Sequence, residues 1–84
     1  MIEQMSVEAF KSIIPTLGER QQLVLDVIID NPGCCNREIA FLVGLEINKV
    51  TPRVFELRSM NLVKSSGWKV DDVSGCRVNT WEEA

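Results

Sequence analysis

Residues 37–63 read REIAFLVGLEINKVTPRVFELRSMNLV and carry the clearest structural signal in this chain. Two helices that cross steeply need a small residue where their backbones approach and a residue free to take positive φ in the turn between them. Ala40 and Gly44 meet these two needs, so the spacing predicts helices over residues 37–43 and 48–60. The aliphatic residues expected in the core between the two helices are Ile39, Val43, Val50, Val54 and Leu57.

The starts of these two helices are marked by residues that can cap a helix. Either Asn36 or Cys35 is expected to cap the first helix. Asn48 is a candidate cap for the second helix, while Pro52 can instead set its start near Thr51. In both cases the proline falls early in the helix, where at most one backbone hydrogen bond is lost.

Two further helices are predicted before this stretch. The first spans residues 7–14 and ends at Pro15. Thr16 and Glu19 have the spacing of a capping box, which predicts a second helix over residues 17–30. The apolar side of the first helix consists of Val7, Phe10, Ile13 and Ile14.

After Leu62 the hydrophobic period changes from helical to about two residues. Residues 62–70 and 76–81 are therefore predicted to form the two strands of an antiparallel hairpin. Trp68 and Trp81 alternate with polar residues on these strands. We expect both rings to anchor the hairpin on the helices.

The composition fits one folded domain. Eighty-four residues are too few for two separate cores, and 45% hydrophobic with 25% charged residues argue against both disorder and a membrane protein. No apolar run approaches the roughly 18–20 residues that span a bilayer, so we expect a cytoplasmic protein without membrane contact. The single domain, residues 1–84, is expected to contain an N-terminal helix (1–15), a three-helix core (16–61) and the hairpin (62–82).

The reactive residue types exclude most enzyme classes. The chain has no histidine, which removes Ser-His-Asp and Cys-His catalytic systems and every histidine-containing metal site. The three cysteines, Cys34, Cys35 and Cys76, are an odd number with two of them adjacent, so we expect small buried thiols in a reducing compartment. No catalytic residue, metal site or cofactor is predicted.

The net charge of −3 is unevenly distributed along the chain. Residues 1–35 and 70–84 each carry a net charge of −3, whereas residues 36–69 carry +3. A charged ligand responds to the local field more than to the net charge of the whole protein. The middle segment is therefore the candidate site for an anionic partner.

Residues 37–63, together with SGCRVNTW at residues 74–81, resemble the winged helix-turn-helix domains of MarR-type regulators and of small phage or prophage DNA-binding proteins. The resemblance extends over residues 17–81. Asn61 stands where these domains have a glycine, and asparagine tolerates the same left-handed backbone. The resemblance implies an α+β, mostly helical fold: a winged helix-turn-helix with a C-terminal two-stranded hairpin wing, to which this chain adds a short N-terminal helix.

The same resemblance implies sequence-specific binding of double-stranded DNA by a small transcriptional regulator of bacterial or phage type, and not an enzyme. The helix around residues 48–60 would read the major groove, and the hairpin at residues 62–81 would contact flanking DNA. The residues expected to contact DNA are Arg37, Asn48, Lys49, Thr51, Arg53, Lys64, Lys69 and Arg77.

The expected role of each residue follows from its side-chain chemistry. Arg53 can bind a guanine or a phosphate, and Asn48 can pair with adenine. Thr51 can touch a thymine methyl or a backbone oxygen. Lys49 and Arg37 are expected to bind phosphates.

An alternative is a winged-helix module that binds a protein instead of DNA, such as a phage factor or a replication or repair accessory; the two acidic ends favour it. Phe41 and Phe55 are expected at the edge of the core, with a partner-binding patch as the alternative. The apolar side of residues 7–14 can dock on its own domain or on a second subunit, and we favour a homodimer. No small-molecule ligand is predicted.

Overall fold

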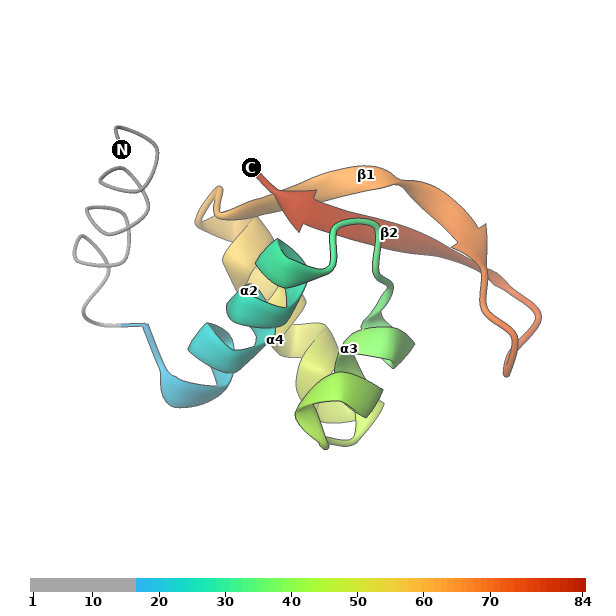
Figure 1. The fold of residues 1–84 in the computed structure, drawn as a ribbon, viewed down its shortest axis with the longest axis horizontal. Helices are drawn as coiled ribbons and strands as arrows, with labels where there is room; N and C mark the ends of the chain where they lie inside the picture. Colours follow the sequence, from blue (N-terminus) through green and yellow to red (C-terminus); the bar gives the residue numbers. More distant parts are fainter. Residues whose placement is uncertain (1–16) are drawn as a thin grey trace.

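The computed structural model of the protein describes residues 17–84. Three helices are followed by a two-stranded antiparallel hairpin, which confirms the predicted α+β, mostly helical winged arrangement. In Figure 1 the helices pack together and the hairpin crosses one side of them before extending beyond them. The helix predicted over residues 7–14 lies outside the described residues. The elements are α2 (Glu19–Asp30), α3 (Asn36–Val43), α4 (Ile47–Ser59), β1 (Val63–Val70) and β2 (Arg77–Glu83).

The core lies where the three helices meet. The predicted inward residues Ile39, Val50, Val54 and Leu57 are buried, and Val43 packs against them with part of its surface exposed. The other members of the core come from α2, from the loop before α3, from α3 and from the chain around and within the hairpin: Val24, Leu25, Ile28, Cys34, Ala40, Leu62, Val63 and Trp81. None of the helices within residues 17–84 is long and apolar enough to cross a membrane.

Helix α2 starts later than predicted. Its cap is Gly18, whose backbone N–H donates to Oε1 of Gln21 over 2.8 Å. Glu19 is the first residue of the helix itself, so its predicted part in a capping box is wrong; Thr16, the other member of that box, lies outside the described residues. Gln21 lies three residues after Gly18 and supplies the same type of acceptor that Glu19 was expected to supply.

Helix α3 begins and ends as the sequence indicates. Of the two candidate caps, Cys35 is the cap, and its N–H donates to Oε1 of Glu38 over 3.0 Å. The helix ends at Gly44, which takes the left-handed conformation with φ of 72°. Asn61, after α4, also has positive φ (61°), as predicted.

Helix α4 begins at Ile47 with Glu46 as its cap. The predictions that Asn48 caps this helix and that Pro52 sets its start near Thr51 are both wrong. The first turn closes when the Lys49 N–H donates to the Glu46 carbonyl over 2.9 Å, so the helix is already formed before the proline. Pro52 then removes a single hydrogen bond from the helix.

The hairpin is tied to the helices through its second strand. The Gly33 N–H donates to the Trp81 carbonyl over 2.7 Å, and the Trp81 N–H donates to the Cys34 carbonyl over 2.8 Å. The loop before α3 therefore pairs with β2 through one isolated bridge, between Cys34 and Trp81. The strands β1 and β2 pair over most of their length, with an irregularity between Ser65 and Gly67.

The two tryptophans lie in different environments. Trp81 is 6% exposed, and its indole N–H donates to Oδ1 of Asn36 over 2.8 Å. Trp68 is 58% exposed, because it lies opposite Asn79 on the part of the hairpin farther from the chain end. The predicted anchoring role is confirmed for Trp81 and wrong for Trp68.

Three other burial predictions need correction. Phe41 and Phe55 are exposed and do not lie at the edge of the core, because each projects from the outer side of its helix. Cys34 and Cys35 are buried as expected, whereas Cys76 is exposed beside the hairpin turn. Burial raises the pKa of the Cys34 thiol to about 11, so this thiol stays protonated at neutral pH.

Candidate nucleic-acid interface

A groove of about 410 Å³ lies between the start of α3, the first half of α4 and the hairpin. Its walls bring together residues that are far apart in the sequence. Three of the predicted contact residues, Arg37, Thr51 and Arg77, line it. The polar residues that line it besides these are Asn36, Asp71, Ser74 and Asn79.

Asn36 joins the three walls of this groove. Its Oδ1 accepts from the Trp81 indole, and its Nδ2 donates to Oγ1 of Thr51 over 3.3 Å. The Thr51 hydroxyl in turn donates to the Ile47 carbonyl over 3.1 Å. The hairpin, α3 and α4 therefore hold fixed positions relative to one another at this point. Sequence reasoning considered Asn36 only as a cap and missed this role.

The outer face of α4 is polar at its N-terminal end. Asn48 is exposed there on the side opposite the buried residues, and Lys49 and Thr51 are exposed on the two flanks of the helix. Among residues 17–84 the ammonium group of Lys49 makes no ion pair. This end of α4 is next to the groove because Thr51 belongs to both.

Arg53 turns away from this outer face toward α2. Its Nε donates to Oε1 of Glu56 over 2.8 Å and its Nη2 to Oε2 over 3.2 Å. Gln21 on α2 also donates to Oε1 of Glu56, over 2.8 Å. The hydrogen bonds from Gln21 and Arg53 lower the pKa of the Glu56 carboxyl group. The structure thus places Arg53 in an ion pair beside α2 and not in the groove.

Arg37 connects α3 to the base of the hairpin turn. Its Nε donates to both carboxylate oxygens of Asp71, over 3.0 and 2.9 Å. Asp71 is a buried carboxylate that also accepts from the Ser74 hydroxyl over 3.0 Å. The Arg37 hydrogen bond, followed by that of Ser74, holds the pKa of Asp71 below its usual value. Arg37 therefore fixes the hairpin and still reaches the groove.

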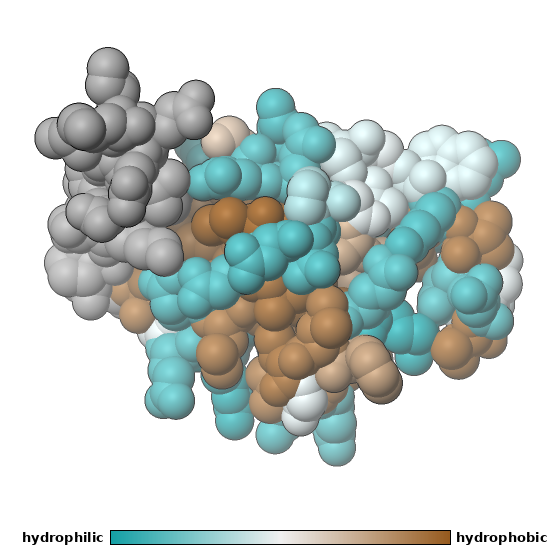
Figure 2. Space-filling model, in the orientation of Figure 1, coloured by the Kyte–Doolittle hydropathy of each residue, from teal (hydrophilic) through white to brown (hydrophobic). Residues whose placement is uncertain are grey.

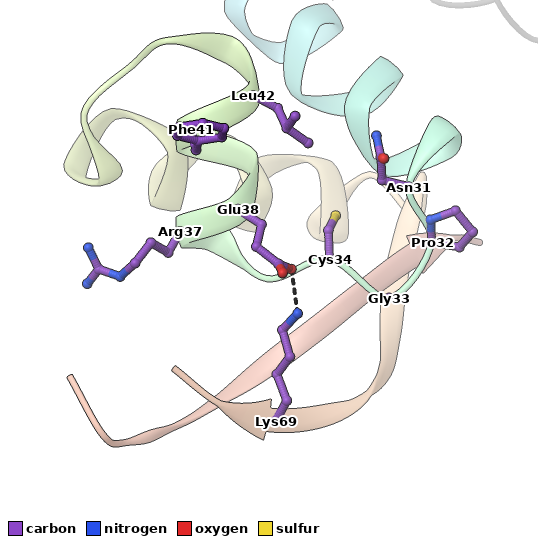
Figure 3. A pocket seen from close by; sticks show the side chains of 9 residues that line it. All are labelled: Asn31, Pro32, Gly33, Cys34, Arg37, Glu38, Phe41, Leu42 and Lys69. Atoms are coloured by element: carbon purple, nitrogen blue, oxygen red, sulfur yellow. Dashed lines mark hydrogen bonds and ion pairs between the residues drawn. The ribbon is translucent and has the colours of Figure 1, made fainter. Parts of the chain in front are cut away.

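The two lysines of β1 are paired with acids. The ammonium of Lys69 donates to Oε1 of Glu38 on α3, as Figure 3 shows, and Lys64 lies 3.5 Å from Oε2 of Glu82. The Lys69 hydrogen bond lowers the pKa of Glu38, and the same bond raises the pKa of Lys69. Neither lysine lines the groove: Lys69 lines a second cavity, beside α3 and the loop before it, and Lys64 lines neither this cavity nor the groove.

Arg77 is held by an aromatic ring. Its guanidinium carbon lies 4.3 Å from the centre of the Trp68 ring, a cation–π distance. Asn79 is directly opposite Trp68 in the hairpin and two residues from Arg77, so these three side chains share one face of the sheet. Sequence reasoning missed Asn79 and gave Trp68 a different role; the alternation of Arg77 and Asn79 was the available signal.

With this geometry in place, comparison with known proteins defines the family. The profile of the winged helix-turn-helix DNA-binding family matches residues 17–64, and the chain belongs to this family. No curated protein matches the sequence significantly.

Solved structures of transcriptional regulators share the fold. The regulator PcaV from Streptomyces coelicolor, solved with its natural ligand, is 19% identical in sequence and has a TM-score of 0.63. The match covers 99% of this chain and 60% of the PcaV chain. The regulator SlyA is 18% identical with a TM-score of 0.65 over 96% of this chain and 58% of its own. ZitR from Lactococcus lactis is 19% identical with a TM-score of 0.56 over 99% of this chain and 58% of its own.

These similarities confirm the predicted resemblance to MarR-type regulators at the level of the fold. The chain spans only 58–60% of the length of the three solved structures. What those larger proteins bind or assemble with is therefore not carried over to this chain by the shared fold.

Proposed function

We propose that this protein binds double-stranded DNA in a sequence-specific manner and acts as a small transcriptional regulator of bacterial or phage type. In this proposal α4 enters the major groove and the hairpin contacts flanking DNA. Membership of the winged helix-turn-helix DNA-binding family supports DNA as the ligand, and the regulators of similar fold support a role in transcription.

The observation that carries the proposal is the local pairing of three acidic residues, of which Asp71 lines the groove, Glu38 lies on α3 and Glu56 lies on α4. Glu38, Glu56 and Asp71 each form an ion pair with a basic residue of the domain. Their charges are therefore compensated locally and repel a phosphate backbone less than the sequence count suggests. Lys49, in contrast, is exposed at the start of α4 and makes no ion pair with any residue of 17–84.

The proposed contacts divide between positioning and base reading. Lys49 and the guanidinium of Arg37 bind phosphates, while Asn48 and Thr51 at the start of α4 face base edges. Arg77, held over Trp68, enters the minor groove beside the recognition site. Arg53 contacts DNA only when its ion pair with Glu56 is broken.

Fluorescence anisotropy with a mixed-sequence duplex at about 50 and 200 mM salt tests this proposal. We expect micromolar binding that weakens steeply with salt, because non-specific affinity comes from phosphate contacts. The double variant Lys49→Glu/Arg77→Glu should lose this binding. Arg20→Glu, an exposed charge reversal on α2, is the control and should retain binding. Absence of binding by the folded wild-type protein at the lower salt would rule out the proposal.

A second candidate function, binding of a protein partner, is favoured by a different surface. Phe41 is 86% and Leu42 52% exposed, and both line a cavity of about 630 Å³ between α3, the loop before it and Lys69 (Figure 3). Figure 2 shows hydrophobic residues gathered over this part of the molecule and again at the far end of the hairpin. A protein partner whose binding is lost in Phe41→Glu and kept in Lys49→Glu/Arg77→Glu would support this function.

A further inference from the structure

Two exposed nonpolar residues lie in the middle of the outer face of α4. Phe55 is 70% exposed, and Pro52, three residues earlier, is exposed on the same side of the helix. The buried residues Val50, Val54 and Leu57 occupy the opposite side. The centre of the proposed reading face is therefore nonpolar, with Asn48 at its N-terminal end.

The Phe55 ring is not part of the hydrophobic core of residues 17–84. The backbone carbonyl of Phe55 accepts a hydrogen bond from the Ser59 hydroxyl over 2.9 Å. Exposed apolar residues that lie together and are rimmed by polar ones are a feature of binding surfaces, and Phe55 and Pro52 lie together in this way. A ligand that binds this face of α4 has to present an apolar group surrounded by polar groups.

The major groove offers such a group at only one base. Thymine presents its 5-methyl group there, whereas guanine, cytosine and adenine present hydrogen-bond donors and acceptors that a phenyl ring cannot satisfy. Charge agrees with this occupant, because the exposed ammonium of Lys49 lies on the same helix and Glu56 is already paired with Arg53.

We infer that Phe55 contacts a thymine methyl and makes thymine the preferred base at one position of the target site. This inference rests on the proposed DNA-binding function and adds a specificity-determining residue to it. Phe55 follows Asn48 by seven residues, which is roughly 10 Å along a helix axis. At about 3.4 Å per base step, the thymine lies about three base pairs from the base next to Asn48.

The test uses duplexes selected from a randomised pool by the wild-type protein. Each thymine of a selected duplex is replaced in turn by deoxyuridine, which lacks only the 5-methyl group. At one position the wild-type affinity should fall by about fourfold, the effect of leaving one methyl-sized group in water. Phe55→Ala should bind the thymine and deoxyuridine duplexes equally at that position, while Phe55→Leu should retain part of the preference.

Phe41→Ala is the matched control, because it removes another exposed phenyl ring, from α3, and should leave the thymine preference intact. The inference is overturned if the wild-type protein shows no position sensitive to deoxyuridine, or if Phe55→Ala keeps the same sensitivity. It is also overturned if Phe55→Ala changes the sedimentation of the free protein and not its base preference, which would assign the ring to a second copy of the chain. Failure of the wild-type protein to select any duplex would instead reject the proposed function itself.

Discussion

Helix α4 and the hairpin each carry three basic residues, yet the two regions use them differently. On the hairpin, Lys64 and Lys69 pair with acids and Arg77 stacks on Trp68. On α4, Arg53 pairs with Glu56 and Arg58 lies 5.5 Å from the centre of the Trp81 ring, but Lys49 makes no ion pair with any residue of 17–84. The number of basic residues in a region therefore does not measure how much positive charge that region offers to a ligand.

The largest expected effect tests how the hairpin is attached. Trp81→Ala should lower the free energy of unfolding by about 3–5 kcal/mol, because it empties a buried site and removes the hydrogen bond to Asn36. Trp68→Ala should change it by only about 0.5 kcal/mol or less, because that ring is exposed. Urea denaturation followed by circular dichroism measures both. Equal losses in the two variants would show that the hairpin has no distinct base and outer end.

The next effect separates free from paired lysines. Lys49→Ala should lower the salt dependence of DNA binding by about one unit of log K against log[salt], as expected for one lost phosphate contact. Lys69→Ala should lower it less, because Glu38 already holds that ammonium group. Anisotropy titrations at several salt concentrations give the two slopes. A larger change for Lys69 would reverse the comparison between α4 and the hairpin.

Breaking the ion pair of Arg53 should strengthen DNA binding, the opposite of the effect of removing Lys49. Glu56→Gln removes the carboxylate that holds the guanidinium and one negative charge on α4. We expect DNA affinity to rise and the salt dependence to increase by up to about one unit. The matched variant Glu19→Gln removes an exposed acid at the start of α2 and should leave both quantities nearly unchanged. Weaker binding by Glu56→Gln would mean that Arg53 acts only in its paired position.

The smallest effect concerns pH. The pKa of Asp71 is lowered in the folded protein, so its pairing with Arg37 stabilises the fold above the ordinary aspartate range and this contribution is lost as pH falls through the folded pKa. Asp71→Asn should therefore be less stable than wild type at neutral pH, and the gap should narrow in acid. Thermal melts from about pH 7 down to pH 3 measure it. A difference in stability that does not change with pH would show that the ion pair is not its cause.

The parts of the fold that were predicted correctly depend on local sequence. Ala40, Gly44 and the apolar spacing of α4 describe contacts between neighbouring turns, and Asn61 reports a single backbone conformation. The helix starts were harder, because Gly18 and Glu46 occupy the cap positions without a side-chain cap hydrogen bond, while residue types that cap helices more often lie nearby.

The parts that were missed depend on contacts between distant residues. Arg37 and Asp71 are 34 positions apart, and Glu38 and Lys69 are 31 apart. Neither ion pair has a local signature in the sequence. Sequence reasoning therefore takes all four residues for unpaired surface charges. Trp68 and Trp81 share one alternating pattern, and only the position of the hairpin over the helices separates the buried ring from the exposed one.

The short pairing between the loop before α3 and β2 also affects how the domain comes apart. The Gly33 N–H donates to the Trp81 carbonyl and the Cys34 carbonyl accepts from the Trp81 N–H, so this bridge closes a loop that contains α3, α4 and β1. A contact between residues so far apart in the chain forms at a high entropic cost and is gained late in folding. The wing and the helical core therefore belong to one cooperative unit, and the amide hydrogen of Trp81 should exchange with solvent only when the whole domain unfolds.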